Sequence, residues 1–464
     1  MGSRTGNSKK SLFETVPVSK ALATLAGPTI VSQLINLVYN MVDAFFIGRT
    51  GNSYMIAATT LSLTIFMMTI AISNLFGIGG GSLMARLAGQ GRLDEARQAS
   101  AYSFYGAITA ALMYSLLIGA FLTPVLRFLG ASDDTLGYCR SYTIIVIVIG
   151  SVPVILSMAL AHLLRNVGYS GQASIGLSGG GILNIILDPI FMFVILPRGY
   201  EVVGAALATL VSYIISCSYL LYAFRKAAQT ASLSMSPGVA RQLSKANRKE
   251  LFRVGIPSAV LTGLFDVANI FANMIAAAHG DLVLAGLGIV MKIERIPNAI
   301  SIGICQGMIP LVAYNYSSGN HDRMNLTIRT ARLWGLTIAF TSIILLEAAA
   351  RPLSQVFLSI SAGNAEEALM TIGFAVLLLR IRVIASPFQF LNYSSSFSMQ
   401  AMGNGRGTLI HAVVREFVFY VPMMFLFDRL FSVEGLGAAL PAGEACGAVF
   451  ALWLLRRFLK KTDG

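Results

Sequence analysis

The chain has 464 residues, of which 55% are hydrophobic and only 12% are charged, and its mean hydropathy is +0.71. Soluble proteins usually carry about 25% charged residues, so this composition excludes a soluble enzyme or binding domain and indicates a polytopic membrane protein. The formal net charge of +13 does not require nucleic acid as a partner, because basic loops on one side of a membrane explain it.

Twelve apolar windows follow one another along the chain, each long enough to cross a bilayer as a helix. Runs such as YTIIVIVIGSVPVILSMALA lack the alternation of apolar and polar residues that marks the strands of outer-membrane barrels. The sequence therefore predicts an all-α polytopic membrane protein. The windows cover residues 21–47, 54–80, 99–122, 136–160, 172–196, 203–224, 254–278, 283–306, 330–350, 370–399, 408–428 and 436–456.

The second half of the chain repeats the first. Three matched pairs of segments are RNVGYSG (165–171) with QAMGNGRG (400–407), VGAALAT (203–209) with LGAALPA (436–442), and AGQGRLDEA (88–96) with YSSGNHDRM (316–324). A period of about 230 residues is far longer than any solenoid unit. It predicts two homologous six-helix bundles that begin on the same side of the membrane and are related by a pseudo-two-fold axis along the membrane normal.

The expected division is an N-terminal lobe of residues 1–226, a polar linker of residues 227–250 and a C-terminal lobe of residues 251–464. Lysines and arginines are concentrated in the loops on the side of this linker and of both termini, which places both termini in the cytoplasm. The four cysteines are scattered without metal or redox spacing.

Helix 1 carries three polar residues on one face. Asn36, Asn40 and Asp43 are four and three positions apart, so their side chains are neighbours on a helix. An ionisable residue at membrane depth is costly and is by default a functional candidate. The alternative is that Asp43 is an interfacial carboxylate that reaches water near Arg49.

Helix 5 carries a second polar pair, Asn184 and Asp188, again four positions apart. Pro189 removes a backbone donor and opens the preceding turn, so its freed carbonyls could join the two side chains in binding Na⁺ or a proton with water. The alternative is that Asp188 only compensates for the proline kink. Asp43 and Asp188 both fall in the outer half of first-half helices and could share a cavity, where repulsion and desolvation would favour proton uptake.

The second half places its charges elsewhere. Asp266 in helix 7 shares a face with Asn269, and Glu294 and Arg295 are adjacent in helix 8. A substrate site and a structural ion-pair network remain open for this half. Further charges at membrane depth are Lys292, Arg380, Arg382, Arg415 and Glu416.

Six blocks of sequence, in order and within two halves, resemble the multidrug and toxic compound extrusion (MATE) family, and in particular its MepA-like branch. The resemblance covers the chain from about Leu12. The blocks are AGPTIVSQLINLVYNMVDAFFIGRTG, GIGGGSLMARLAGQGRLDEA, LRNVGYSG, ILNIILDPIF, VGAALAT and GICQGMIPLVAYNYSSGNHDR.

The resemblance implies a monomeric antiporter of a prokaryotic inner membrane that expels amphipathic, often cationic, drugs against an inward H⁺ or Na⁺ gradient. The sequence shows no nucleophile–base pairing that argues for an enzyme, and we expect no cofactor other than H⁺ or Na⁺ as the coupling ion. The family's coupling site corresponds here to Asp43, Asn184, Asp188 and Thr209.

Two further family positions transfer less directly. A helix 4 tyrosine of the coupling site corresponds to either Tyr142 or Tyr138. Some relatives pair a helix 7 carboxylate, which matches Asp266, with a helix 10 aspartate, where this chain has the neutral Asn392. This departure favours ion coupling through the first lobe.

Two other functions remain as alternatives. A lipid-linked oligosaccharide flippase of the same superfamily would need a strongly cationic central cavity and often has extra helices. A polytopic membrane enzyme such as a prenyl-group transferase would need a helically spaced aspartate cluster for Mg²⁺ at a membrane face, and the sequence has none.

Overall fold

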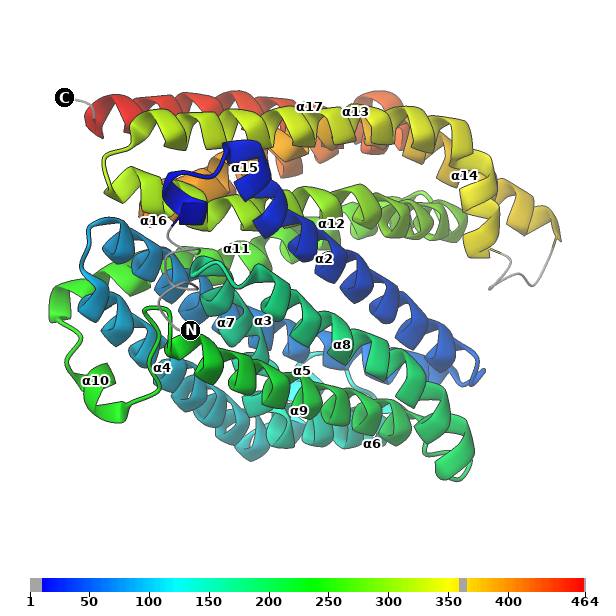
Figure 1. Ribbon diagram of the computed structural model, residues 1–464. Helices are drawn as coiled ribbons and strands as arrows, with labels where there is room; N and C mark the ends of the chain where they lie inside the picture. Colours follow the sequence, from blue (N-terminus) through cyan, green and yellow to red (C-terminus); the bar gives the residue numbers. More distant parts are fainter. Residues whose placement is uncertain (1–10, 359–364, 463–464) are drawn as a thin grey trace.

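The computed structural model describes residues 11–358 and 365–462, and every regular element in these two ranges is a helix (Figure 1). The elements of the first half are α2 (Val18–Gly48), α3 (Ser53–Gly89), α4 (Leu93–Ala120), α5 (Leu122–Phe128), α6 (Asp133–Thr143), η1 (Ile144–Ile149), α7 (Ser151–Asn166), α8 (Ser170–Pro189), η2 (Ile190–Ile195) and α9 (Glu201–Ala228). Those that follow are α10 (Pro237–Arg241), α11 (Lys245–Ala278), α12 (Asp281–Ser317), α13 (His321–Leu358), α14 (Ala365–Arg382), η3 (Val383–Ala385), α15 (Ser386–Ala401), α16 (Gly405–Val413), η4 (Val414–Tyr420) and α17 (Val421–Thr462).

Within the described ranges, these helices form twelve candidate membrane spans. α6 and α7 form one span with a bend of 53°. The apolar run from Gly405 to Lys460 has 56 residues, or about 84 Å of helix, far more than the roughly 30 Å of a bilayer core. It is broken at Ser432, where φ is 55° and ψ is −133°, and so makes two spans. The predicted all-α fold is confirmed.

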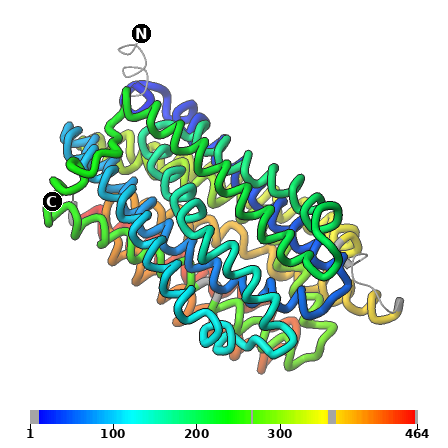
Figure 2. Tube along the Cα trace, turned by 90° about the horizontal axis from the view of Figure 1, so that it is seen from below, coloured from blue at the N-terminus to red at the C-terminus, as the bar shows by residue number. Residues whose placement is uncertain are grey.

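The helices form two bundles, which lie one above the other in Figure 1. α2 and α11 lie between them. α2 packs on α8 of its own bundle and on α12 of the other, while α11 packs on α16 and α17 of its own bundle and on α3 of the other. The first helix of each repeat therefore contacts both bundles. Figure 2, which turns the molecule by 90°, shows the two chain ends at the same end of the molecule. We name this end, with α10, the termini face.

Two equivalent helix crossings join the bundles. A Cβ at Gly79 of α3 would lie 2.8 Å from Gly255 Cα of α11, and a Cβ at Gly307 of α12 would lie 2.5 Å from Ala26 Cα of α2. Gly79 and Gly307 are 228 positions apart, and Ala26 and Gly255 are 229 apart. The repeat seen in the sequence is therefore also a repeat of contacts, as the predicted pseudo-two-fold axis requires.

The segment between the bundles is packed rather than free. Tyr105 of α4 donates a hydrogen bond from its hydroxyl to the Met235 carbonyl (2.8 Å), and the Arg248 guanidinium lies 5.4 Å from the Tyr102 ring centre. α9 extends to Ala228 and α11 begins at Lys245, so most of the predicted linker is short α10 and its flanks.

Candidate functional site

The two polar residues predicted on helix 5 lie together in the first bundle. Asp188 is fully buried and Asn184 is 2% exposed. The Asn184 side-chain amide donates to Asp188 Oδ1 (3.1 Å) and lies 3.4 Å from Thr209 Oγ1 of α9. The spacing of four residues on α8 thus produces the predicted contact.

Asp43 and Tyr142 complete this group, which we name the carboxylate cluster. Asp43 and Asp188 are close enough to interact electrostatically. Tyr142 is close enough to interact electrostatically with both carboxylates, and it lies near Thr209. Within the described residues no hydrogen bond joins Tyr138 to the cluster, so the geometry selects Tyr142 between the two candidates.

The carboxylate cluster contains buried oxygens that lack partners. Asp43 Oδ1, Asn184 Oδ1 and Asp188 Oδ2 accept no hydrogen bond from the described residues. A buried acceptor without a donor is costly, so a proton, a cation or water satisfies it. Carboxylate and amide oxygens are the ligands that hard cations prefer. Asp43 forms no ion pair with Arg49, so the interfacial interpretation of Asp43 lacks its contact.

The helices are irregular beside the polar groups. The α-helical hydrogen-bond pattern of α8 ends at Pro189, and the chain continues as the π-helical segment η2. A second π-helical segment, η1, begins two residues after Tyr142, and a third, η4, contains Arg415 and Glu416. Such segments are frequent at functional sites because they widen a turn and re-aim its side chains.

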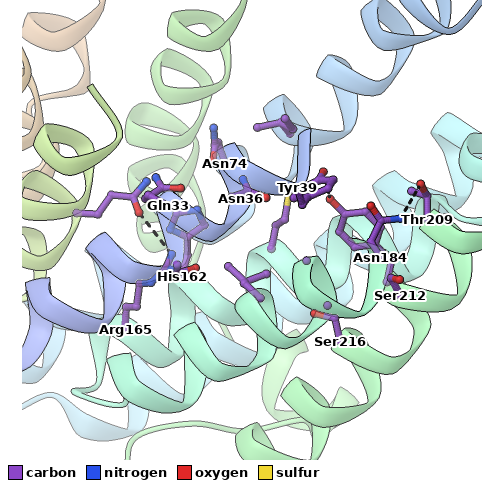
Figure 3. A pocket seen from close by; sticks show the side chains of 18 residues that line it. Gln33, Asn36, Tyr39, Asn74, His162, Arg165, Asn184, Thr209, Ser212 and Ser216 are labelled. Carbon is purple, nitrogen blue, oxygen red and sulfur yellow. Dashed lines mark hydrogen bonds between the residues drawn. The ribbon is translucent and has the colours of Figure 1, made fainter. Parts of the chain in front are cut away.

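Asn184 and Thr209 also line a cavity of about 160 Å³ in the first bundle, the first-lobe cavity (Figure 3). Most of the residues that line it have polar side chains. The labelled residues are Gln33, Asn36, Tyr39, Asn74, His162, Arg165, Asn184, Thr209, Ser212 and Ser216.

A larger cavity of about 410 Å³ lies between the bundles, the inter-lobe cavity. It shares four lining residues with the first-lobe cavity, namely Gln33, Asn36, Asn74 and Gln306. Asn40 lines this cavity and donates to the Asn36 carbonyl (2.6 Å). The structure therefore does not bring Asn40 into the carboxylate cluster, because its side chain lines the inter-lobe cavity and its amide bonds to its own helix.

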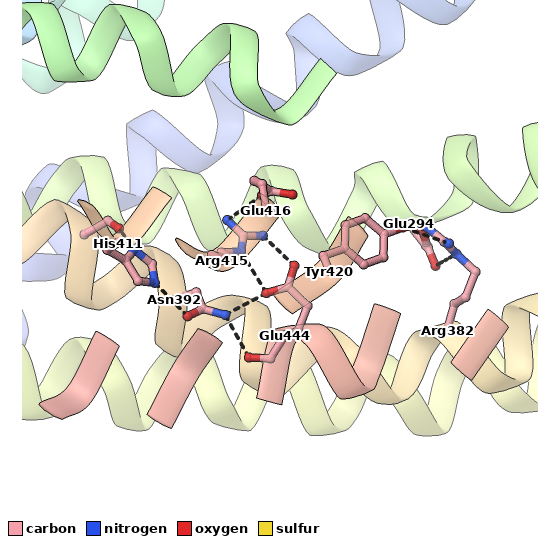
Figure 4. Close-up of polar contacts among 9 residues, drawn as sticks. Glu294, Arg382, Asn392, His411, Arg415, Glu416, Tyr420 and Glu444 are labelled. Carbon is pink, nitrogen blue, oxygen red and sulfur yellow. Dashed lines mark hydrogen bonds and ion pairs between the residues drawn. The ribbon is translucent and has the colours of Figure 1, made fainter. Parts of the chain in front are cut away.

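The second bundle holds a buried polar network (Figure 4). Arg415 forms a bidentate ion pair with Glu444, with N–O distances of 2.5 and 2.9 Å, and lies 3.5 Å from a Glu416 oxygen. The side-chain amide of Asn392 donates to Glu444 Oε2 (2.6 Å), and its oxygen is 3.0 Å from His411 Nε2. The side chain of Asn392 thus contacts both Glu444 and His411.

The other second-half candidates separate into pairs and single groups. Arg382 pairs with Glu294 through two contacts of 3.0 Å, and Arg380 pairs with Glu347 at 3.4 Å. Glu294 therefore belongs to an ion pair, as the structural interpretation expected. Arg295 is exposed and lines the inter-lobe cavity.

The predicted helix 7 pair is only partly described. Asn269 is half-buried in α11 and lines neither cavity, and the side chain of Asp266 lies outside the described residues. The expected role of Asp266 therefore lies outside what the structure describes.

Sequence reasoning missed Glu444, His411 and His162, and it missed the burial of Arg165, which falls between the apolar windows 136–160 and 172–196. Glu444 is a single acid within the last apolar window, so the cost of membrane burial could have identified it. Arg165 is instead in the last turn of α7 and only 4% exposed. Its helix continues beyond the apolar window because one side of the helix faces a polar cavity rather than lipid.

The bundles are joined at the termini face by polar contacts as well. Ser82 donates to the Gln400 carbonyl (2.8 Å), and Arg86 contacts the Ala401 carbonyl (3.3 Å) and pairs with Glu250 (3.2 Å). Like Arg165, Arg86 falls between two apolar windows of the sequence and is nevertheless a buried helical residue.

Known proteins resemble this chain along nearly its whole length. It is 29% identical over 451 residues to the multidrug export protein MepA of Staphylococcus saprophyticus, covering 96% of this chain and 95% of that protein. It is also 29% identical over 458 residues to MepA of Staphylococcus aureus, with the same coverage.

Solved structures share the fold. A crystal structure of MATE in complex with MaL6 matches with a TM-score of 0.91 at 21% identity, over 98% of this chain and 99% of that one. A multidrug resistance MATE family transporter of the MOP superfamily in an outward-facing conformation matches with a TM-score of 0.90 at 21% identity, over 98% of both chains.

The MatE family model matches twice, at residues 28–190 and 257–426, so each of the two repeats carries one match. Together these two segments cover most of the chain. The chain belongs to the MatE family of membrane transporters and is not an enzyme.

Proposed function

We propose that this protein is a secondary active multidrug exporter that expels amphipathic, often cationic, small molecules by antiport against an inward H⁺ or Na⁺ gradient. The observation that carries the proposal is the carboxylate cluster, where three buried oxygens of Asp43, Asn184 and Asp188 lack a donor. The names of the relatives, multidrug export proteins, support the substrate class.

Ion binding and drug binding are coupled because both use the first lobe. Asn184 and Thr209 belong to the carboxylate cluster and also line the first-lobe cavity. A proton or Na⁺ that binds between Asp43 and Asp188 neutralises negative charge and draws in the Asn184 and Thr209 oxygens. This change weakens the attraction of the cavity for a cationic compound, which is then released.

The two lobes, residues 1–226 and 251–464, move relative to each other about the α2–α12 and α3–α11 crossings. The bundle contacts of Ser82, Arg86, Gly79 and Gly307 lie toward the termini face. With both termini in the cytoplasm of a prokaryotic inner membrane, this arrangement is closed to the cytoplasm. The working unit is a monomer.

A lipid-linked oligosaccharide flippase remains the second candidate. Large anionic head groups would need a strongly cationic central cavity. Glu416 lines the inter-lobe cavity beside Arg415 and Arg295. This mixed charge favours small amphipathic substrates.

The test measures efflux of a cationic dye from proteoliposomes under separately imposed proton and sodium gradients. Asp43→Asn and Asp188→Asn are each expected to abolish gradient-driven efflux while the protein elutes as a folded monomer. Asp133→Asn is the matched control, because the Asp133 side chain is 91% exposed and pairs with Arg127, away from the carboxylate cluster. Undiminished efflux in both cluster variants would refute the assignment, and the active gradient identifies the coupling ion.

A further inference from the structure

Arg165 is a buried cation that forms no ion pair with an acid among the described residues. It is 4% exposed at the end of α7 and lines the first-lobe cavity. Its Nη1 lies 3.5 Å from Gln306 Oε1, at the limit of a hydrogen bond, and its Nε has no partner among the described residues. Figure 3 shows the side chain beside His162, below Gln33.

The other buried arginines of the described chain are all paired with acids. Arg86 pairs with Glu250, Arg382 with Glu294 and Arg415 with Glu444. The fold thus supplies a carboxylate wherever it buries a guanidinium, except at Arg165. An unpaired buried charge is strongly unfavourable, so an anion from outside the chain is the natural partner.

The groups that face Arg165 are neutral or cationic. His162 precedes it by one helical turn on α7, and the cavity wall continues with Gln33 of α2, Asn74 of α3 and Gln306 of α12. An acid is absent from the described lining of this cavity. Amides can donate hydrogen bonds to an anion, and the planar guanidinium fork matches the two oxygens of a carboxylate.

The first-lobe cavity therefore has two ends of opposite character. Arg165 marks one end, and at the other end Asn184 donates to the Asp188 carboxylate and lies 3.4 Å from Thr209 Oγ1. The lining shared with the inter-lobe cavity gives a ligand more room than either cavity alone. A compound with an anionic group and an amine satisfies both ends at once.

We propose that Arg165 is an anion-binding subsite that takes a carboxylate-type anion, so that the transporter binds zwitterionic amphiphiles by both charges. The inference rests on the proposed export function. The anion is carried either on the transported compound or as a free inorganic ion such as chloride. Both sources use the same guanidinium chemistry, and binding experiments separate them.

The experiment measures equilibrium binding to the purified full-length protein in detergent, without a gradient. The probes are a xanthene dye that carries both an amine and a free carboxylate, and the methyl ester of the same dye. The wild-type protein should bind the acid about tenfold more tightly than the ester. Arg165→Gln should remove this difference by weakening acid binding about tenfold and leaving ester binding unchanged.

Two further variants serve as comparisons for Arg165→Gln. Arg165→Lys, which keeps the charge but loses the fork, should retain part of the preference. Arg332→Gln is the matched control, because Arg332 is a half-buried arginine that contacts Ser394 and Ser395, without an acid and outside both cavities. If Arg165→Gln does not fold, the proposal is tested by the affinities of the wild-type protein and of Arg165→Lys for the two dyes.

A chloride titration distinguishes the source of the anion. If chloride is the anion, ester binding rises with chloride in the wild-type protein and not in Arg165→Gln, which also supports the subsite. The proposal is overturned if wild-type protein binds both dyes equally and ignores chloride, or if Arg165→Gln weakens both dyes equally. Gradient-driven efflux of the ester tests the export function separately, because the ester has no carboxylate.

Discussion

Glu95 and Arg323 occupy the same position in the two repeats, 228 residues apart, and each holds the chain segment that enters the first helix of the opposite repeat. Glu95 Oε2 accepts a hydrogen bond from the Asn247 side-chain amide at the start of α11 (2.7 Å). Arg323 Nε donates to the Phe13 carbonyl before α2 (2.7 Å). At the termini face, each repeat therefore forms a hydrogen bond to the segment that begins the first helix of the other repeat.

We expect Arg323→Gln to loosen the N-terminal segment, because the guanidinium also donates to the Leu12 and Val16 carbonyls. Hydrogen exchange measured by mass spectrometry should show faster exchange of residues 11–16, with export reduced only modestly. Arg329→Gln is the control, since Arg329 is exposed on the same helix. Equal exchange rates in wild type and Arg323→Gln would contradict this role.

The Gly255 contact allows a test of the crossing between α3 and α11. A Cβ at Gly255 would clash with the Leu75 carbonyl, which is backbone and cannot rotate away. Overpacking of this kind typically costs about 1–3 kcal/mol. We expect Gly255→Val to lower the apparent unfolding temperature in detergent and to reduce export.

Gly263→Val is the matched control for this crossing. Gly263 lies two turns further along α11, and a Cβ there would meet nothing within 4 Å. Its variant should unfold near the wild-type temperature. If both valine variants behaved alike, helix propensity rather than the close approach of the two helices would explain the loss.

The sequence predicted features that depend on local spacing or on hydropathy. The twelve spans and the contact between Asn184 and Asp188 follow from residues near one another in the chain. The pairing of Arg415 with Glu444 joins η4 to the last span, so it depends on packing that no periodicity records. The burial of Arg165 could not be predicted from hydropathy. A hydropathy window ends where one side of a helix becomes polar, whether that side faces water or an internal cavity.

Thr209 should tune the affinity for the coupling ion. Its hydroxyl lies 3.4 Å from the Asn184 amide nitrogen and near Tyr142. A hydrogen bond at such a site contributes about 1 kcal/mol, so Thr209→Val should raise the ion concentration for half-maximal efflux several-fold. Thr209→Ser keeps the hydroxyl and should stay close to wild type. A valine variant with unchanged ion dependence would remove Thr209 from the site.

Glu444 is expected to matter for stability more than for ion coupling. Its carboxylate holds the buried Arg415 guanidinium by two contacts and accepts from Asn392, and all three side chains are less than a tenth exposed. Removing one partner of a buried ion pair leaves an uncompensated charge and costs about 3–5 kcal/mol. Glu444→Gln should therefore lower the apparent unfolding temperature strongly.

The comparison for Glu444 is Glu347→Gln. Glu347 pairs with Arg380 at 3.4 Å, but the Arg380 side chain is 59% exposed and the Glu347 side chain 37% exposed. Pairs this exposed typically contribute about 0–1 kcal/mol, so the control should barely shift the unfolding temperature. A small shift in both variants would mean that Glu416, 3.5 Å from Arg415, takes over as its counter-ion. The double variant Glu416→Gln with Glu444→Gln should then show the full loss of stability.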